Sequence, residues 1–211
     1  MTPKKPTTIF LVRHGQTTST GIVLPGRAPG LHLSPKGREQ AERVAERFAA
    51  MKKPPTVLYA SPLERAQETA APIAKALKLR TLKNSGVIEC DFGQWTGKKL
   101  ALLSKKPEWR TVQNAPSTFR FPQGESFIEM QTRIWDALNK LHEKHPGQSI
   151  IVVSHADPIK AAVTYAQGVP LDLFQRTVIS TCSVSAIALS GHGPIVLSVN
   201  NTSNLKELIV S

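Results

Sequence analysis

The pattern of apolar and polar positions alternates between short continuous apolar runs and longer stretches with helical spacing. A continuous run of apolar and β-branched residues is typical of a strand that is buried on both faces. Such runs lie at residues 7–12, 56–60, 149–153, 183–189 and 195–199. They predict five strands, and the first and third of them end in polar loops.

Apolar residues spaced three and four apart predict helices between these strands. The predicted helices cover residues 34–51, 61–77, 124–145 and 159–166. Ser61-Pro62-Leu63-Glu64 has the sequence of a capping box with proline at the first helical position, so we expect that helix to begin directly after its strand. Strands that alternate with helices predict an α/β fold, here a three-layer αβα sandwich with a mostly parallel sheet.

The regular pattern is lost between the second and third predicted helices. Residues 80–88 carry short strand-like runs, and residues 91–123 are predicted to be an irregular, cap-like excursion over the core. The sequence shows no internal repeat, and 211 residues are enough to bury one substantial core. We therefore expect residues 1–211 to form a single domain.

The composition is that of an ordinary globular protein, with 40% hydrophobic and 20% charged residues. Even the longest purely apolar runs, such as Ile150–Val153, are far too short for a membrane span. The apolar run before Arg13 is too short for a signal peptide. We therefore expect a cytoplasmic protein without a membrane partner. Cys90 and Cys182 are too few for a disulfide framework, and we expect both to be free thiols.

The net charge of +12 lies entirely in the first half of the chain. Residues 1–106 hold 19 Lys+Arg against 7 Asp+Glu, whereas residues 107–211 hold 8 of each. The basic residues occur as dispersed pairs and not as a stripe with aromatic residues between them, so a nucleic-acid partner is not expected. The charge instead predicts an acidic or polyanionic substrate whose association weakens with salt.

Reactive side chains follow three of the predicted strands. The first strand ends in Arg13-His14-Gly15, the second leads into the helix that carries Arg65 on its first turns, and the third ends in Ser154-His155. Ligands of open α/β sheets bind beyond the carboxyl ends of the strands. Guanidinium groups and free N–H groups at helix N-termini both bind anionic oxygens, so the sequence predicts a phosphate pocket.

Residues Leu11 to Thr17 form the first of several motifs that occur in a recognisable order. The others are Leu33-Ser34 to Gly37, Ser61 to Ala66 with Thr69, Ile88-Glu89 with Phe92-Gly93, Trp95 to Gly97, Gly124-Glu125-Ser126, and Val153-Ser154-His155. This series resembles the histidine phosphatase superfamily, in its phosphoglycerate mutase-like branch, over about residues 7–190. A set of ordered motifs is far more specific than any one of them.

The resemblance implies a metal-independent phosphomonoesterase that acts on a small anionic metabolite through a phosphohistidine intermediate at His14. Arg13, Arg65 and His155 would hold the phosphoryl oxygens, and Glu89 would be the general acid. Gly15, Thr20 and Ala156 are the further phosphate-binding positions; Thr20 stands where relatives often have asparagine, and Ala156 where they often have glycine. No cofactor or metal is expected, since the arginines neutralise the charge. A cationic setting should keep the His14 imidazole neutral.

The sequence leaves several alternatives open. Asp157 lies one position later than the acid of the acid phosphatase branch, which favours Glu89 as donor. A cofactor-dependent phosphoglycerate mutase would use the same residues, but the short segment between Gly97 and Gly124 favours hydrolysis. A binding module that has lost turnover is a third reading, which the intact set of catalytic residues disfavours. Folds of this type often dimerise, so a homodimer is one expectation and the oligomeric state stays open.

Overall fold

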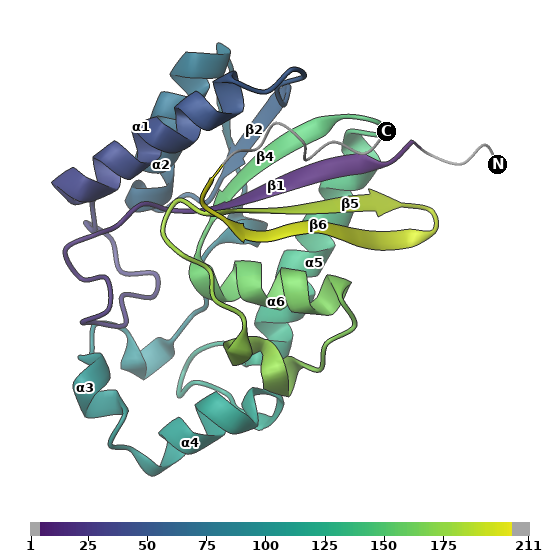
Figure 1. Cartoon of the computed structure of the whole chain (residues 1–211). Coiled ribbons are helices and arrows are strands. Elements are labelled where there is room, and N and C mark those ends of the chain that lie inside the picture. The colour runs from purple at the N-terminus through teal and green to yellow at the C-terminus, as the bar shows by residue number, and fades with distance from the viewer. Residues whose placement is uncertain (1–4, 204–211) are drawn as a thin grey trace.

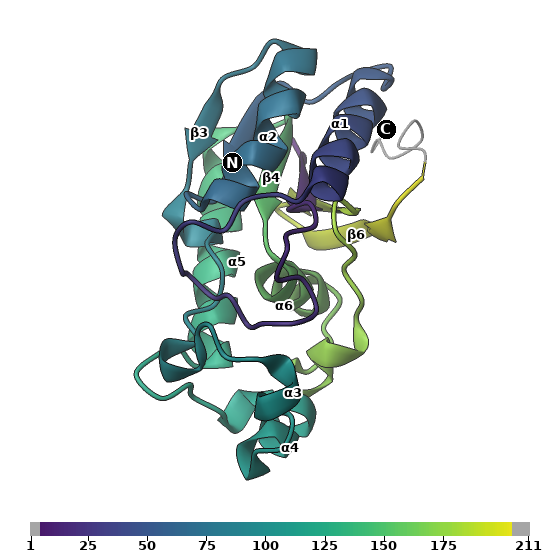
Figure 2. The same cartoon turned by 90° about the vertical axis from the view of Figure 1, so that its left-hand side faces the viewer.

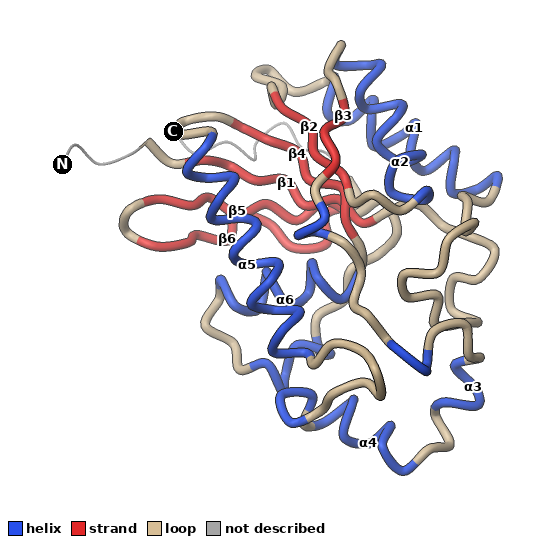
Figure 3. Tube along the Cα trace, turned by 180° about the vertical axis from the view of Figure 1, so that it is seen from behind, coloured by secondary structure: helices blue, strands red, loops and turns tan. Residues whose placement is uncertain are grey.

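A central sheet of six strands organises the computed structural model, which describes residues 5–203. The strands are β1 (Thr7–Arg13), β2 (Val57–Ala60), β3 (Thr81–Lys83), β4 (Ser149–Ser154), β5 (Val184–Ser190) and β6 (Gly193–Asn201). Figure 3 shows their order, β3-β2-β4-β1-β5-β6. β1 to β4 are mutually parallel, whereas β5 runs antiparallel to β1 and β6 antiparallel to β5. The predicted mostly parallel sheet is confirmed.

Helices cover both faces of this sheet (Figure 1). One face carries α1 (Pro35–Ala49) and α2 (Glu64–Leu77), and the other carries α5 (Phe127–Lys144) and α6 (Ala156–Ala166). Successive side chains of a strand point to opposite faces. Accordingly Phe10 packs in the core of α1 and α2, whereas Ile9 packs in the core of α5 and α6. The predicted three-layer sandwich is confirmed, and both faces of β1 are buried.

Three helix starts depart from the sequence prediction, and one of them is that of α6, which begins at Ala156 and not at residue 159. α2 begins at Glu64 and has no side-chain cap at Leu63, so the predicted capping box at Ser61 is wrong. The Ser61 hydroxyl instead bonds the imidazole of His155, a tertiary contact that the local pattern does not show. α5 begins at Phe127 and not at Gly124. Ser126 and Glu129 form a complete capping box at its start.

The excursion at residues 91–123 is not wholly irregular. It contains α3 (Leu100–Leu103) and α4 (Pro107–Asn114), which lie at the end of the molecule away from α1 and α2 (Figure 2). Each helix has one buried residue, Leu103 or Val112, so neither carries the periodic apolar face that reveals a helix in the sequence. The excursion packs on the start of α5 through aromatic rings: the centroid of Phe121 lies 5.2 Å from that of Phe127.

Both cysteines are buried free thiols, as the sequence predicts. Within residues 5–203 no helix is long and apolar enough to cross a membrane.

Candidate active site

The two histidines predicted to be catalytic follow directly from neighbouring parallel strands. β1 and β4 pair in register with Arg13 opposite Ser154, so His14 and His155 leave the sheet side by side. The His14 backbone N–H donates to the Ser154 carbonyl at 3.0 Å, and the two imidazole centroids lie 5.1 Å apart. Strand register alone therefore brings together two residues 141 positions apart in the chain.

His14 is held as a neutral imidazole with one free nitrogen. Its Nδ1 lies 2.7 Å from its neighbour Gly15's carbonyl oxygen, which requires the proton on Nδ1 and leaves the lone pair on Nε2. Arg65 Nε donates to that Nε2 at 3.3 Å. Burial, and secondly the charge of Arg65, lower the pKa of His14 to about 3. The expected neutral state is present, with burial as its main cause and the cationic setting as a lesser one.

The orientation of His155 is set by Ser61, a residue that the sequence assigned to a helix cap. The Ser61 hydroxyl bonds His155 Nε2 at 2.8 Å. The hydroxyl accepts from the Leu63 N–H at 3.4 Å and keeps its own proton to donate; when it donates to Nε2, the proton of the neutral ring sits on Nδ1. Burial, followed by the charge of Arg65, holds the pKa of His155 well below its usual value.

Three buried donors around His14 lack a partner among the described residues: Arg13 Nε, Arg65 Nη1 and His155 Nδ1. The other ends of the guanidinium groups are anchored, with Arg13 Nη1 donating to the Ile179 carbonyl at 2.6 Å and Arg65 Nη2 to Gly26 at 2.8 Å. An unpaired buried donor costs free energy, and such groups mark sites where an acceptor binds. A phosphoryl group against His14 Nε2 would supply acceptors.

Arg13 and His14 line a cavity of about 230 Å³, whereas Arg65 and His155 are fully buried and do not belong to its lining. The cavity is lined by Arg13, His14, Thr17, Thr20, Gly21, Val23, Leu24, Pro25, Glu89, Phe92, Leu100, Ala156 and Asp157. Thr20 and Ala156 therefore stand where the sequence places them, Ala156 as the first residue of α6. A helix N-terminus presents free N–H groups that favour an anion.

Gly15 has a different place from the one the sequence implies. It does not line the cavity, and its N–H donates to Thr69 Oγ1 at 3.0 Å. A Cβ at this position would lie 2.5 Å from the Gly37 carbonyl oxygen, so only glycine fits between β1 and α1. Gly15 serves the site by orienting His14 through its carbonyl.

The outer wall of the cavity is apolar. We call Val23, Leu24, Pro25, Phe92 and Leu100 the cavity wall. The loop after β1 and the excursion form this wall together: Val23 pairs with Lys99 in an isolated antiparallel bridge, and Leu100 N–H donates to the Ile22 carbonyl at 2.9 Å. Arg13 is the one Lys or Arg in the lining. The excess positive charge of the first half of the chain therefore lies outside the cavity.

Glu89 has the environment of a carboxyl that exchanges protons near neutral pH. Its Oε1 accepts from the Cys90 N–H at 2.9 Å, and its Oε2 lies 3.9 Å from His155 Nδ1. Burial, and secondly the charge of Asp157, raise the pKa of Glu89 to about 7. Asp157 is itself paired with Lys160 at 3.5 Å on the first turns of α6.

Comparison with known proteins assigns this arrangement to a family. The model of the histidine phosphatase superfamily (branch 1) matches residues 9–202. The chain belongs to this superfamily. It is a phosphatase of the histidine phosphatase type.

The relatives of this histidine phosphatase carry several names. The chain is 31% identical over 207 residues to phosphoserine phosphatase 1 of Hydrogenobacter thermophilus, covering 96% of both chains. It is 33% identical over 182 residues to a probable phosphoglycerate mutase of Cronobacter sakazakii, covering 85% of this chain and 83% of that protein. The structure of a mycobacterial glucosyl-3-phosphoglycerate phosphatase superposes with a TM-score of 0.82 at 22% identity, over 93% of this chain and all of that one.

Sequence reasoning missed two features of this histidine phosphatase. One is Ser61, although its place in the motif before Arg65 is a signal. The other is a group of charged residues behind Glu89, in which Glu125 bonds Arg133 at 2.7 Å and pairs with Arg27 at 2.9 Å. Glu125 belongs to a motif that the sequence shows, but Arg27 and Arg133 belong to none.

Proposed function

We propose that this protein hydrolyses small phosphomonoesters without a metal, through a phosphohistidine at His14. The observation that carries the proposal is the state of His14. Its imidazole is neutral and held through Nδ1, its Nε2 accepts from Arg65 Nε, and Arg13 Nε and Arg65 Nη1 are buried donors without a partner among the described residues. A neutral imidazole has a lone pair for attack, and the unpaired donors match the oxygens of the group it would attack.

In the first step His14 Nε2 attacks phosphorus and the bond to the leaving oxygen breaks. Charge on the equatorial oxygens is stabilised by Arg13, Arg65 and His155, which are held in place before the substrate arrives. The leaving oxygen takes the proton of Glu89, whose pKa of about 7 makes the protonated form abundant at neutral pH. The products are an alcohol and phosphohistidine, with Glu89 as the carboxylate.

In the second step the Glu89 carboxylate takes a proton from water as that water attacks phosphorus. The bond between phosphorus and His14 Nε2 breaks, and the electron pair returns to the imidazole. Inorganic phosphate leaves, and both His14 and Glu89 regain their starting states. One residue thus serves as acid and then as base, which a pKa near the working pH favours.

The substrate we propose is a small metabolite that is anionic through its phosphate. A cavity of about 230 Å³ with an apolar wall accommodates a leaving group of a few carbon atoms. A carboxylate on that leaving group would face Asp157 with no lysine in the lining to pair with it. This disfavours phosphoglycerate mutase as the alternative, although one relative carries that name. The cytoplasmic location and the homodimer stay predictions.

The test is a hydrolysis screen in EDTA with wild type, His14→Ala and the control His192→Ala, an exposed histidine in the turn between β5 and β6. The esters are phosphoserine, 3-phosphoglycerate, glycerol 3-phosphate and phenyl phosphate, with and without 2,3-bisphosphoglycerate. We expect phosphate release that survives chelation, is lost in His14→Ala and is unchanged in His192→Ala. Isomerisation of 3-phosphoglycerate without phosphate release would instead support the mutase.

The intermediate has its own test. Wild type quenched in alkali during turnover of a ³²P-labelled ester should carry label on a histidine, since phosphohistidine is stable to base and labile to acid. The label should be absent from His14→Ala. Turnover by His14→Ala at the wild-type rate would refute the proposal.

A further inference from the structure

Glu89 is supported from behind by charged side chains that no step of the reaction uses. Arg27 lies far in the sequence from Glu125 and Arg133, which are eight residues apart, and we call the three the Arg27–Glu125–Arg133 cluster. Their side chains are 31%, 16% and 21% exposed. None of them lines the cavity, so none is placed to touch the substrate.

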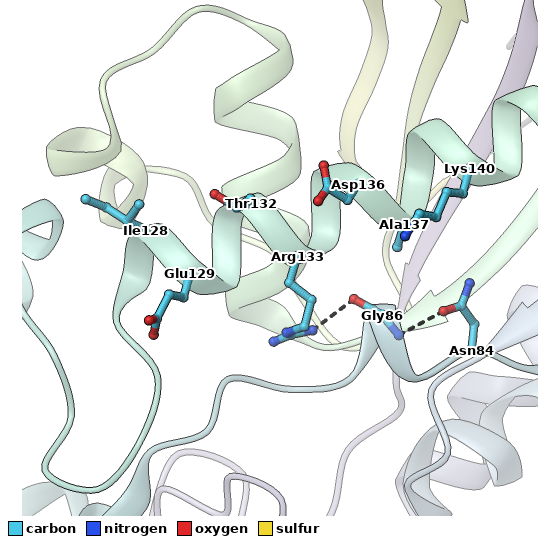
Figure 4. A pocket seen from close by; sticks show the side chains of 9 residues that line it. All are labelled: Asn84, Gly86, Ile128, Glu129, Thr132, Arg133, Asp136, Ala137 and Lys140. Atoms are coloured by element: carbon cyan, nitrogen blue, oxygen red, sulfur yellow. Dashed lines mark hydrogen bonds between the residues drawn. The ribbon is translucent and has the colours of Figure 1, made fainter.

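Arg133 binds the main chain that leads to Glu89. It lies on α5 and reaches the segment after β3, where Nη1 donates to the carbonyl of Gly86 at 2.9 Å (Figure 4). The same Nη1 donates to the carbonyl of Ile88 at 2.9 Å. Its Nη2 donates to the carbonyl of Glu89 itself at 3.3 Å. Three successive hydrogen bonds to carbonyl oxygens fix the path of the segment and not merely one of its atoms.

Arg27 binds the same carbonyl as Arg133 does. Its Nε donates to the Glu89 carbonyl at 2.9 Å, and its Nη2 lies 2.9 Å from Glu125 Oε2. Glu125 is bidentate with Arg133, at 2.7 Å and 2.9 Å, and also accepts from the Asp91 N–H at 3.0 Å. Arg27 Nη2 meets Glu125 as an ion pair without a hydrogen bond of its own. The bidentate pair of Glu125 with Arg133 and the bonds to the main chain form a support in which each group fixes the geometry of the next.

The cluster leaves the Glu89 carboxyl itself free. That carboxyl accepts from the Cys90 N–H and faces His155 Nδ1, and it has no hydrogen bond to either arginine. Glu89 therefore keeps a pKa near neutrality, while its backbone is fixed by two cations. A direct ion pair would instead favour the carboxylate and remove the proton that a general acid needs.

We propose that Arg133, with Arg27 and Glu125, is a positioning residue for proton donation by Glu89. This inference rests on the proposed role of Glu89 as general acid. Displacement of a catalytic group by about 1 Å can lower a rate a hundredfold. A loosened Glu89 should therefore slow only those reactions whose leaving group needs a proton.

The experiment compares two esters on the same preparation of Arg133→Met. Butyl phosphate has a leaving group that requires protonation, whereas p-nitrophenolate leaves without it. The quantity measured is kcat/KM, which reports steps up to loss of the leaving group and excludes hydrolysis of the phosphoenzyme. We expect a loss of about 30-fold on butyl phosphate and less than about threefold on p-nitrophenyl phosphate.

The ratio of the two losses does not depend on how much of the preparation is folded, because both esters use the same folded enzyme. Arg120→Met is the matched control: Arg120 pairs with Glu129 on the first turn of α5 and binds no carbonyl between residues 86 and 89. It should leave the ratio unchanged. Glu125→Gln, which keeps the size of the side chain and removes its charge, should change the ratio in the same direction as Arg133→Met.

A double-mutant cycle shows whether Arg133 acts through Glu89. In the Glu89→Gln background, Arg133→Met should cost less than about twofold on butyl phosphate, because no proton donor remains to be positioned. An equal loss on both esters, or an undiminished loss in the Glu89→Gln background, would overturn the inference. Failure of the proposed function looks different: Glu89→Gln alone would then hydrolyse butyl phosphate as fast as wild type.

Discussion

Replacing Glu89 by glutamine should stabilise the fold, and more so as the pH rises. In the folded protein the pKa of Glu89 is about 7, against an ordinary 4.5, because burial and Asp157 disfavour the carboxylate. Below pH 4.5 both folded and unfolded chains hold the proton. Between the two pKa values only the folded chain holds it, so the free energy of unfolding falls with rising pH.

The size of the effect follows from this difference in pKa. A difference of about 2.5 units corresponds to about 3 kcal/mol, the cost of an ionised Glu89 above pH 7. Glutamine carries no charge at any pH. The free energy of unfolding of Glu89→Gln minus that of wild type should therefore rise by about 3 kcal/mol between pH 4.5 and pH 8, whatever constant offset the substitution adds.

The assay is urea unfolding of both proteins at several pH values in buffers free of phosphate, since phosphate would bind the folded site and stabilise it. Glu125→Gln is the control of opposite sign. Burial acts to raise the pKa of Glu125, but hydrogen bonds from Arg133 and the Asp91 N–H outweigh it and the pKa is lowered. Because the pKa of Glu125 is lowered, the ionised side chain stabilises the fold, and this stabilisation is fully present above pH 4.5. Glu125→Gln should therefore be destabilised by a constant amount from pH 5 to 8. A difference for Glu89→Gln that stays flat over this range would refute the reasoning.

Three further predictions concern single contacts. Ser61→Ala removes the bond that sets the His155 tautomer and should lower kcat/KM about tenfold in steady-state assays; an unchanged rate contradicts this. Gly15→Ala places a Cβ 2.5 Å from the Gly37 carbonyl oxygen and should cost about 3 kcal/mol in urea unfolding, while Gly191→Ala, which meets no atom within 4 Å, should cost less than about 0.5 kcal/mol. Glycerol 3-phosphate should exceed 3-phosphoglycerate in kcat/KM by about tenfold, because the carboxylate faces Asp157; the reverse order would count against the reading of the cavity.

The layers of the fold could be predicted because both faces of β1 and β4 are buried. The continuous β-branched runs of these two strands are typical of strands that are buried on both faces. The meeting of His14 and His155 also follows from the sequence, since each ends a strand and parallel strands end at one edge of the sheet. Glu89 lines the same cavity as His14, and its role as general acid stays a prediction.

The rest depended on tertiary contacts that no local pattern carries. Ser61 has the sequence of a helix cap, yet its hydroxyl bonds a histidine 94 residues away. Arg27 and Arg133 both bind the Glu89 carbonyl, although they lie in opposite halves of the chain. No spacing in the sequence links them to each other or to Glu89. The net charge does not say where the charges lie: Arg13 is the one lysine or arginine that lines the cavity, and the salt dependence that the charge predicts stays a prediction.

The cavity wall has a consequence for how such an enzyme changes its preferences over evolutionary time. The groups around the phosphoryl position come from strand ends and first helical turns, where a substitution disturbs the core. The wall comes from two loop segments joined by the bridge between Val23 and Lys99 and the bond from Leu100 to Ile22. Insertions and exchanges in surface segments are tolerated far better than changes in a packed sheet. Sequence changes in the excursion can therefore alter which leaving groups the cavity accepts. The residues around His14 that react with the phosphoryl group stay the same.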